Sequence, residues 1–281
     1  MQKNKINLRQ KIKLSKFQNE LVGGEAHYYL DKAKTIHLNE YLGRHVLIEF
    51  LNEIHCVACD RKIKKSFQQG FCFPCFRALA QCDSCMMRPE LCHYHEGTCR
   101  EPEWGEAHCF QSHYIYLANT GNLKVGITRF SNVPHRWIDQ GATQALPILR
   151  VKERLHSGLV EVLFKSHVAD KTNWRTMLKG GFDAIDLIAR RDDLFSKVKD
   201  ELDELMSRIG VDAIEVLQDQ KIIDIHFPVL QNPLKITTHN LDKNPLVEGE
   251  LLGIRGQYLI LDTGVFNVRK FSGYCCEISL T

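Results

Sequence analysis

The alternation of apolar and polar residues predicts β-structure at both ends of the chain. Residues 45–51 alternate in the manner of a strand, and the glycine pair at residues 23–24 supplies a turn before them. Near the other end, apolar runs separated by glycines predict further strands. These runs cover residues 222–230, 246–254, 257–261 and 265–271. We therefore expect a small N-terminal β unit and, near the C-terminus, a small β-barrel-like sheet.

The middle of the chain mixes strand and helix periodicities. Residues 114–118 and 123–127 both alternate as strands, and the turn formers between them predict a hairpin. Apolar residues of segment 158–168 recur three and four positions apart, which is typical of one helical face. The same spacing predicts a second helix over residues 193–209. These patterns indicate an α/β core that is followed by a helix.

Cysteine is concentrated in one segment, since eight of the eleven cysteines lie between residues 56 and 99. Two Cys-x2-Cys pairs open this segment, Cys56 with Cys59 and Cys72 with Cys75. Each pair forms a knuckle whose thiolates bind an ion at about 2.3 Å, and two knuckles complete a tetrahedral shell. Because Zn²⁺ imposes no geometry of its own and does no redox chemistry, we predict a structural zinc ion at this quartet.

The other cysteines predict a second zinc ion, but their spacing leaves its ligands open. The favoured ligands are Cys82, Cys85, Cys99 and Cys109. The rival ligands are Cys92, His93 and His95. All three rivals follow Cys85 by ten positions or fewer, so each could replace one of the favoured cysteines. A segment this poor in aliphatic residues needs its metals in order to fold.

A disulfide framework is the alternative interpretation of so many cysteines. It requires an oxidising compartment. The first residues contain no apolar run and no small-residue cleavage site, so they do not have the pattern of a secretory signal. No stretch reaches the roughly 18 apolar residues of a membrane span. We therefore expect a cytoplasmic protein whose cysteines bind metal.

Together these patterns predict an α+β protein built from four segments. The segments are an N-terminal β unit (residues 1–52), a zinc-binding cysteine-rich module (53–110), an α/β core (111–190), and a helix with a C-terminal β unit (191–281). Internal repeats and low-complexity linkers are absent from the sequence. We therefore expect the segments to pack together rather than to hang on flexible linkers.

The charge of the chain is concentrated locally, although its total is small. The chain carries 37 basic and 34 acidic residues, a formal net charge of +3, and each zinc ion with four thiolates adds about −2. Six Lys or Arg and no acidic residue precede residue 20, and a second basic cluster spans residues 61–65. Such patches can follow a phosphate backbone, so a nucleic-acid contact would rest on them rather than on net charge.

The predicted α/β core resembles the GIY-YIG nuclease core, a small three-stranded sheet with helices that cleaves phosphodiesters with one divalent metal. The residues that carry the resemblance are Tyr114–Leu117, Lys124–Thr128, Arg136 ten residues after the glycine, and Glu161 on the following helix. The resemblance implies that Tyr116 matches the tyrosine of the first triplet and Gly126 the glycine of the second. It also implies that Arg136 clamps a phosphate and that Glu161 binds Mg²⁺ or Mn²⁺, roles that suit a guanidinium and a carboxylate.

The chain departs from the GIY-YIG pattern at two positions. Lys124 stands where the second triplet has its tyrosine, so one of the two phenols that position or deprotonate the attacking water is absent. A buried lysine with a lowered pKa could act as the base instead. His113, near the expected first glycine, is a further candidate for a polar role at the site.

Polar residues after the hairpin are candidate substrate contacts. Asp139, Gln140 and Gln144 interrupt an otherwise apolar stretch, which is why we assign them to the substrate rather than to the core. Asn173 and Asp170 follow the helix that carries the candidate metal carboxylate, so either could face the same cleft. The alternative for this last pair is a capped helix end in a surface loop.

Five phrases of the sequence resemble an uncharacterised bacterial family, domain of unknown function 2797. They are GTCREPEWG at residues 97–105, YLAN at 116–119, RWIDQGA at 136–142, QALPI at 144–148 and GQYLILDTG at 256–264. The resemblance runs from the cysteine-rich module to the C-terminus. It implies no activity, because the role of that family is unassigned.

Three classes of function are consistent with these features. The first is a metal-dependent endonuclease that acts on DNA or RNA, and the second is a nucleic-acid-binding module without that chemistry. The third is a catalytically inactive, zinc-stabilised scaffold that binds a protein partner. Arg136 and Glu161 favour the first class, Lys124 favours the second, and the small net charge favours the third. We expect a zinc-stabilised nucleic-acid-binding protein that is a candidate endonuclease, and the scaffold is the alternative.

Overall fold

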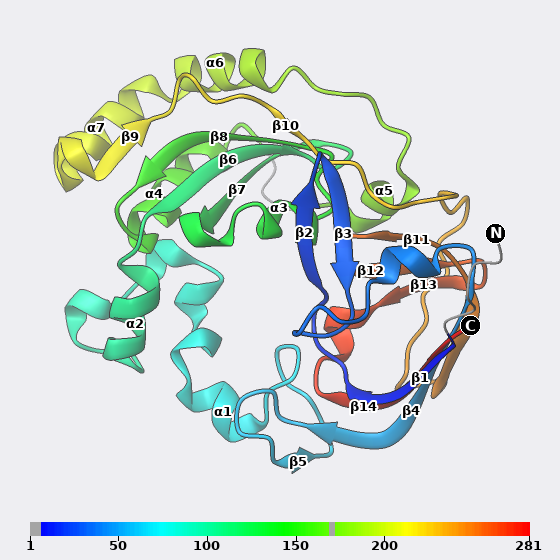
Figure 1. Ribbon diagram of the computed structural model, residues 1–281. Helices are drawn as coiled ribbons and strands as arrows, with labels where there is room; N and C mark the ends of the chain where they lie inside the picture. Colours follow the sequence, from blue (N-terminus) through cyan, green and yellow to red (C-terminus); the bar gives the residue numbers. More distant parts are fainter. Residues whose placement is uncertain (1–6, 169–171) are drawn as a thin grey trace. The chain divides into compact units, whose positions relative to one another are not determined.

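The computed structural model describes residues 7–168 and 172–281, and its contacts group the chain into two compact units (Figure 1). Unit 1 comprises Met1–Phe76, Leu178–Gly181 and His226–Thr281, and unit 2 comprises Arg77–Met177 and Phe182–Ile225. Asp170 and the first basic residues of the chain lie outside the described residues. Helices and strands are both abundant, which confirms the expected mixture of helix and sheet.

Unit 1 is built on a sheet with the strand order β1-β14-β4-β11-β12-β13, and β5 pairs with β4. The strands are β1 (Leu8–Lys13), β4 (His45–His55), β5 (Lys62–Ile63), β11 (Leu246–Arg255), β12 (Tyr258–Leu261), β13 (Gly264–Asn267) and β14 (Tyr274–Leu280). All neighbouring strands run antiparallel. The β-rich ends of the chain therefore form one sheet, because β14 lies between β1 and β4. The pairing of β14 with β1 and β4 joins residues that are far apart in the sequence, so no local pattern of residues predicts it.

Two smaller elements complete the β-structure of unit 1. Strands β2 (Gln18–Val22) and β3 (Glu25–Tyr29) form an antiparallel hairpin. Its turn contains Gly23 and Gly24, whose φ angles of 58° and 85° favour glycine, as the sequence predicted. The short elements of this unit are η1 (Leu38–Tyr41), η8 (Val268–Phe271) and most of α1 (Phe73–Ala78), whose last two residues are counted in unit 2.

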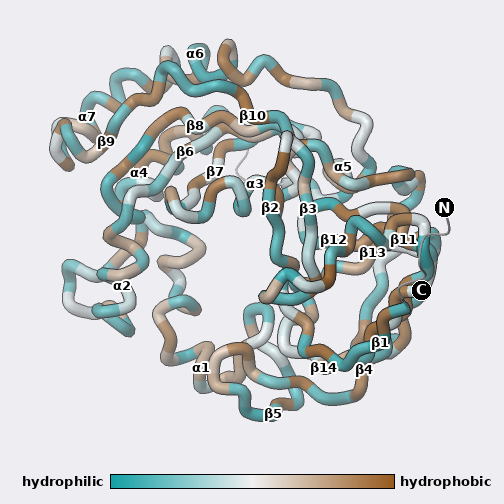
Figure 2. Tube along the Cα trace, viewed as in Figure 1, coloured by the Kyte–Doolittle hydropathy of each residue, from teal (hydrophilic) through white to brown (hydrophobic). Residues whose placement is uncertain are grey.

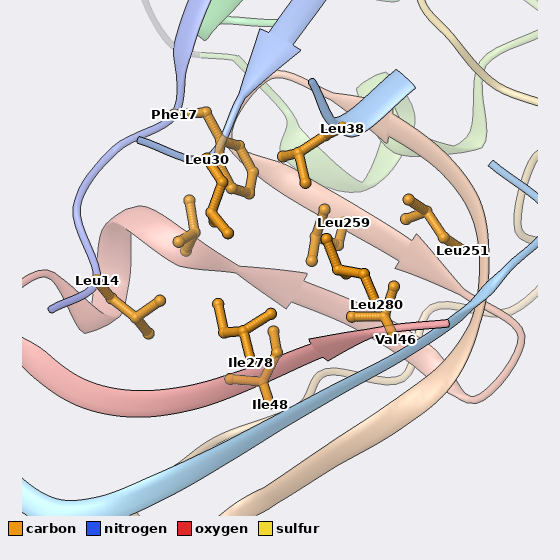
Figure 3. A pocket seen from close by; sticks show the side chains of 11 residues that line it. Leu14, Phe17, Leu30, Leu38, Val46, Ile48, Leu251, Leu259, Ile278 and Leu280 are labelled. Atoms are coloured by element: carbon orange, nitrogen blue, oxygen red, sulfur yellow. The ribbon is translucent and has the colours of Figure 1, made fainter. Parts of the chain in front are cut away.

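Alternate residues of these strands form the apolar core of unit 1 (Figure 2). Leu14, Ile48 and Ile278 are among the side chains that are at most 2% exposed. Figure 3 shows how such side chains from several strands converge, and the cavity that they leave measures only about 10 Å³. A space of this size accommodates about one water molecule, and its apolar lining offers that water no hydrogen bond. We therefore interpret it as core rather than as a ligand site.

Unit 2 contains a second sheet with the strand order β10-β8-β6-β7, and β9 also pairs with β8. The strands are β6 (His113–Asn119), β7 (Leu123–Arg129), β8 (Gln144–Val151), β9 (Ile214–Val216) and β10 (Ile223–Asp224). The β6–β7 hairpin confirms the prediction for residues 114–127. The strand predicted at residues 222–230 is reduced to the two residues of β10.

Six helices of the described chain follow one another between Pro102 and Ile209. They are α2 (Pro102–Cys109), α3 (His135–Asp139), α4 (Arg154–Lys165), α5 (Trp174–Lys179), α6 (Leu187–Lys197) and α7 (Lys199–Ile209). Of these, α4 and α6 contact this second sheet. Single 3₁₀ turns are η2 (Ala80–Cys82), η3 (Ser84–Met86), η4 (Pro89–Leu91), η5 (Tyr94–Glu96), η6 (Phe130–Asn132) and η7 (Val211–Ala213). None of the described helices combines the length and the apolarity that crossing a bilayer requires.

Two helix predictions were wrong in their bounds. The helix expected over residues 158–168 begins at Arg154 and ends at Lys165. The helix expected over residues 193–209 is two helices, because the backbone leaves helical geometry at Val198, where φ is −106° and ψ is 12°. Apolar residues recur at helical spacing on both sides of this break, because both helices pack on the same core. The spacing therefore gives no sign of the break.

Helix α4 packs its apolar face on the sheet of unit 2. Val160 and Phe164 are fully buried in one cluster with Leu117 and Val125 of the β6–β7 hairpin. The cluster also contains Leu202 of α7. Core packing therefore decides which side of α4 faces the sheet, and with it the position of every polar residue on this helix.

Candidate functional site

Four cysteines of unit 1 come together as the sequence predicted. Cys56 directly follows β4, Cys59 lies three residues later, and Cys72 and Cys75 lie at the start of α1. All four sulfurs lie within 4.8 Å of one another. This quartet could hold a metal ion, and four sulfur ligands from two knuckles are compatible with zinc.

Backbone hydrogen bonds shape both knuckles of the quartet. The N–H of Asp60 donates to the carbonyl of Cys56 at 3.0 Å, which closes the first knuckle. The N–H of Cys72 donates to the sulfur of Cys56 at 3.2 Å, so the second knuckle already contacts the first. Glycine is required at Gly70, where φ is 124° and an added Cβ would lie 2.4 Å from Val57. The chain thus brings the sulfurs together through short local turns.

The quartet favours thiolate at one of its sulfurs. Burial opposes ionisation of Cys56, but N–H groups of Cys59, Cys72 and Ala58 outweigh it and lower the pKa of Cys56 to about 6. The guanidinium of Arg61 faces Cys59, and the thiolate there raises the pKa of Arg61. A thiolate is the form that binds metal, so Cys56 is suited to a cation, whereas the hydrogen bond with Cys72 and burial raise the pKa of Cys75.

The second cysteine group, in unit 2, does not converge as one quartet of the predicted ligands. Ligand atoms of Asp83, Cys85 and His93 lie within 4.8 Å of one another. Cys82 is buried, whereas Cys92, Cys99 and Cys109 are half-buried. His95 is exposed and contacts Phe110 and Tyr94 through its ring.

Tyr116 is the centre of the candidate phosphodiester site in unit 2. Its side chain is fully buried on β6 and lies across Gly126, its partner on β7. A Cβ at Gly126 would lie 2.7 Å from the phenol carbon and the hydroxyl of Tyr116, so only glycine leaves room for the ring. Two residues that the sequence paired by resemblance are thus in direct contact.

Three polar side chains act electrostatically on the hydroxyl of Tyr116. Burial raises the pKa of Tyr116, whereas Arg136 and Gln140 oppose this shift and the charge of Glu161 adds to it. All three groups therefore lie within electrostatic range of the phenol. The ring of Trp137 packs edge-on at a centroid distance of 6.0 Å.

Several polar atoms of this cluster are buried without a hydrogen-bond partner among the described residues. They are Oη of Tyr116, Nε1 of Trp137 and Oε1 of Gln140. An unsatisfied buried polar atom costs about 1–3 kcal/mol, so three in one place indicate that water or a ligand completes the site. A donor, an acceptor and a hydroxyl that can act as either could together bind an oxygen-rich group.

Lys124 and Glu161 are two further predicted catalytic residues, and both are buried. Lys124 follows the same face of the hairpin as Gly126, is buried, and donates to Oγ1 of Thr172 at 3.2 Å. Glu161 is 9% exposed on α4 and pairs with Lys165, one turn along the helix, at 3.3 Å. The carboxylate of Glu161 is therefore largely buried and is paired with a cation of its own helix.

His113 has different neighbours from the other predicted catalytic residues. It lies at the start of β6, opposite Arg129 of β7, and is fully buried. Burial lowers its pKa to about 4, and the charges of Arg154 and Arg129 contribute to the shift. Nδ1 lies 2.6 Å from the carbonyl of Gln111, which indicates that Nδ1 carries the proton. His113 is thus a neutral acceptor at pH 7 rather than a charged group.

The remaining predicted substrate contacts have partners within unit 2. Oε1 of Gln144 accepts hydrogen bonds from Asn119 at 3.2 Å and from the N–H of Ile185 at 2.7 Å. Oδ1 of Asn173 accepts a hydrogen bond from the N–H of Thr176 at 3.3 Å, as an N-cap residue of helix α5 does. Asp139 is half-buried at the end of α3. A role for these residues in binding substrate stays a prediction.

Sequence analysis missed one residue that the structure brings into the argument. Arg154 opens α4 seven positions before Glu161, a spacing that places both on one helical face. Its Nη2 donates a hydrogen bond to the carbonyl of Met86 at 2.8 Å, and the charges of Cys109, Cys85, Arg136 and Arg129 act on it. The seven-residue spacing could have indicated that Arg154 and Glu161 share a helical face, but the predicted helix begins only at residue 158.

The two units together define a protein of mixed helix and sheet that carries a candidate metal-binding cysteine quartet. Residues 43–276 match the family model described as "Protein of unknown function (DUF2797)", and the chain belongs to this family. Neither the curated proteins nor the solved structures include a match to the chain. The family assignment agrees with the resemblance seen in the sequence and leaves the function to be argued from the site.

Removing one sulfur tests the metal at the first quartet. Cys56→Ser should lower the zinc content of protein purified without added metal by about one ion per chain, because the quartet loses a buried thiolate ligand. Elemental analysis measures the loss. Cys275→Ser, a half-buried cysteine on β14 outside both groups, should keep the wild-type content. Equal zinc in Cys56→Ser and wild type would contradict the assignment.

A double-mutant cycle tests the contact between Tyr116 and Gly126. Gly126→Ala should destabilise unit 2 by about 1–3 kcal/mol, because the new methyl group overlaps the phenol. In a Tyr116→Ala background the same change should cost much less, since the overlapping ring is gone. Denaturant unfolding of the four proteins gives the coupling energy. The same cost in both backgrounds would show that the ring does not lie where the structure places it.

Proposed function

We propose that this protein binds nucleic acid through its phosphate backbone and acts on a phosphodiester bond at the Tyr116 cluster of unit 2. The observation that carries the proposal is the buried hydroxyl of Tyr116, which has no hydrogen-bond partner among the described residues and whose pKa is affected by Arg136, Gln140 and Glu161. A cation, an acceptor and a carboxylate around one unsatisfied hydroxyl suit a charged, oxygen-rich ligand.

Each residue of the cluster has a role that its chemistry supports. The planar guanidinium of Arg136 can bind two oxygens of one phosphate. The phenol of Tyr116, with Gln140 beside it, can orient the attacking water. Buried Lys124 takes the place of the second tyrosine of the GIY-YIG pattern on the same sheet face. The β6–β7 hairpin, β8 and α4 support a GIY-YIG-like arrangement in this unit.

Glu161 is the residue that would hold Mg²⁺ or Mn²⁺. A single protein carboxylate fits such an ion, which commonly retains several waters and shares the oxygens of a phosphate. When bound, the cation supplies charge stabilisation for the leaving oxygen. Glu161 is only slightly exposed and lies on a helix that core packing fixes, so its position does not depend on a loop.

The cysteines support this function by stabilising the fold rather than by chemistry. We assign zinc to the quartet at Cys56, Cys59, Cys72 and Cys75, because four sulfur ligands leave no open position for a substrate. Basic residues of the 61–65 cluster lie on the loop of this quartet and are exposed at Arg61 and Lys62. They offer a second contact to a phosphate backbone. The proposed partner is a nucleic acid, either DNA or RNA. If neither binds, the protein is instead expected to bind another protein.

The salt dependence of binding tests the contact with phosphate. Affinity for duplex DNA should fall with salt, with a log–log slope that steepens by about 0.9 for each phosphate contacted. Arg136→Ala should reduce the slope by about one contact. Arg208→Ala, an exposed arginine on α7, should leave it unchanged. Fluorescence anisotropy over a series of salt concentrations provides the slopes. If no DNA or RNA binds at low salt, the scaffold alternative replaces this proposal.

Substitution of Glu161 tests cleavage separately from binding. Glu161→Gln should abolish Mg²⁺- or Mn²⁺-dependent cleavage of nucleic acid, because an amide cannot supply the anionic ligand. Affinity for the substrate should stay within a few-fold of wild type. Glu204→Gln, an exposed glutamate on α7, should cleave normally. Gel assays with single- and double-stranded DNA and RNA measure the products. Undiminished cleavage by Glu161→Gln would remove this carboxylate from the site.

A further inference from the structure

Three side chains of unit 2 that differ in chemistry lie within reach of one ion. They are Asp83, Cys85 and His93, and one ligand atom of each lies within 4.8 Å of the other two. Asp83 is buried, whereas Cys85 and His93 are half-buried. A carboxylate oxygen, a sulfur and an imidazole nitrogen are all ligands that Zn²⁺ accepts in proteins. The group therefore has the composition and the spacing of a metal site, although it is not a cysteine quartet.

Hydrogen bonds fix the orientation of the Asp83 carboxylate. Asp83 is the N-cap of η3, the short turn that also contains Cys85, and its Oδ1 accepts a hydrogen bond from the N–H of Ser84 at 2.6 Å. Its other oxygen, Oδ2, pairs with Nε of Arg100 at 2.8 Å. Because each carboxylate oxygen has two lone pairs, Oδ2 can keep its contact with Arg100 and still coordinate an ion.

Hydrogen bonds also fix the ring of His93. The hydroxyl of Thr98 donates its one proton to the backbone carbonyl of His93 at 3.2 Å, and the same hydroxyl oxygen lies 2.7 Å from Nδ1 of the ring. Since the hydroxyl proton is already used, Oγ1 accepts and Nδ1 carries a proton. Nε2 of the neutral ring then offers a lone pair. Metal-binding histidines are commonly held in this way, with a hydrogen bond at the ring nitrogen that does not bind the metal.

The distance between the ligand atoms of His93 and Asp83 distinguishes a metal ion from a proton. Nε2 of His93 lies 3.3 Å from Oδ2 of Asp83. Two acceptors this close repel each other unless a proton or a cation lies between them. A charged N–H···O hydrogen bond measures about 2.7–2.9 Å. A nitrogen and an oxygen that each lie about 2.0–2.1 Å from one tetrahedral ion are about 3.3 Å apart. The observed distance therefore fits the metal ion better.

The Cys56 quartet of unit 1 provides a standard for this comparison. The sulfurs of Cys59 and Cys72 lie 3.8 Å apart. Two sulfurs that each lie about 2.3 Å from one tetrahedral ion are also about 3.8 Å apart. Each group thus contains a pair of ligand atoms at the separation that a tetrahedral zinc ion requires.

The segment of residues 86–92, which joins two of the three candidate ligands, is held against helix α4. A Cβ added at Gly158 would lie 2.4 Å from the backbone nitrogen of Glu90, so the helix and this segment approach without an intervening side chain. Nη2 of Arg154 donates to the carbonyl of Met86 at 2.8 Å, which is a second attachment of the segment to the helix. Ligands on a segment that packing fixes keep their spacing before any ion binds.

We propose that Asp83, Cys85 and His93 bind a second zinc ion, and that the fourth tetrahedral position of this ion is open. No fourth His, Cys, Asp or Glu of the described residues belongs to the group. Three protein ligands and one open position distinguish such a site from a closed structural quartet, and the open position takes water or a small anion. The Cys85 thiol releases its proton to solvent as the metal binds. One thiolate and one carboxylate then balance the charge of Zn²⁺.

This ligand set differs from the one that the spacing predicts. It uses one favoured ligand, Cys85, and one rival, His93, together with a carboxylate that the cysteine spacing does not indicate. The site does not depend on the proposed function, because neither Tyr116 nor Glu161 is part of it.

Two matched histidine variants test the site. Wild type purified without added metal should hold about two zinc ions per chain by elemental analysis, one at the Cys56 quartet and one at the new site. His93→Gln should hold about one, because the site loses its nitrogen ligand. His95→Gln, at an exposed position two residues further on, should hold about two. A single ion in wild type would mean that a proton joins His93 to Asp83, and it would overturn the proposal. Equal zinc contents in the two variants would overturn it as well.

Cobalt-loaded wild type tests the ligand set without any substitution, so it decides the question even where a variant fails to fold. Its thiolate-to-metal absorption should correspond to five coordinated cysteines, the four of the quartet and Cys85. Any other number of thiolates overturns the ligand set. Azide should shift the d–d bands of the second cobalt ion alone, because only this ion has an open position, and bands that azide leaves unchanged overturn that position. None of these measurements involves nucleic acid, so they remain valid if the proposed function fails.

Discussion

The close contact of helix α4 with the backbone of residues 89–90 is the constraint on which the chemistry of unit 2 depends. At Gly158 there is no room for a side chain, so the helix and the cysteine-rich turn approach as closely as two backbones can. The other face of α4 is fixed by the burial of Val160 and Phe164. Held on both sides, the helix presents Arg154 to the cysteines and Glu161 to the Tyr116 cluster. A rigid helix positions charged groups more accurately than a loop would.

Unsatisfied polar atoms distinguish the Tyr116 cluster from ordinary core. Most buried polar groups in a folded protein have a partner, and each exception requires a reason. Gly126 leaves space for the phenol of Tyr116, and burial of that ring and of Trp137 removes both polar tips from solvent. Leaving these tips unpaired costs free energy that packing elsewhere in the unit must offset. A binding site is the usual place for such a cost, which is why the cluster supports a ligand better than the dry apolar cavity of unit 1 does.

The two cysteine groups illustrate different routes to a metal site. In unit 1 both knuckles are local, and their N–H groups lower the pKa of Cys56 before any ion binds. In unit 2 the cysteines are spread over separate turns, and burial raises the pKa of Cys85 and Cys109. The sulfurs of the first group therefore lie close enough together to hold an ion, whereas the cysteines of the second group do not form such a quartet.

The sequence alone determined the features that depend on short separations. The Cys-x2-Cys spacing predicted the quartet at Cys56–Cys75, and alternation around a turn predicted the β6–β7 hairpin, because in both cases the contacting residues are near neighbours in the chain. The tertiary structure decided the rest. Packing between segments that are far apart in the sequence decides three features. They are the pairing of β1 with β14, the break in the helix at Val198, and the position of Arg154 near Cys85. Periodicity reports which face of an element is apolar, but it does not name the partner that covers that face.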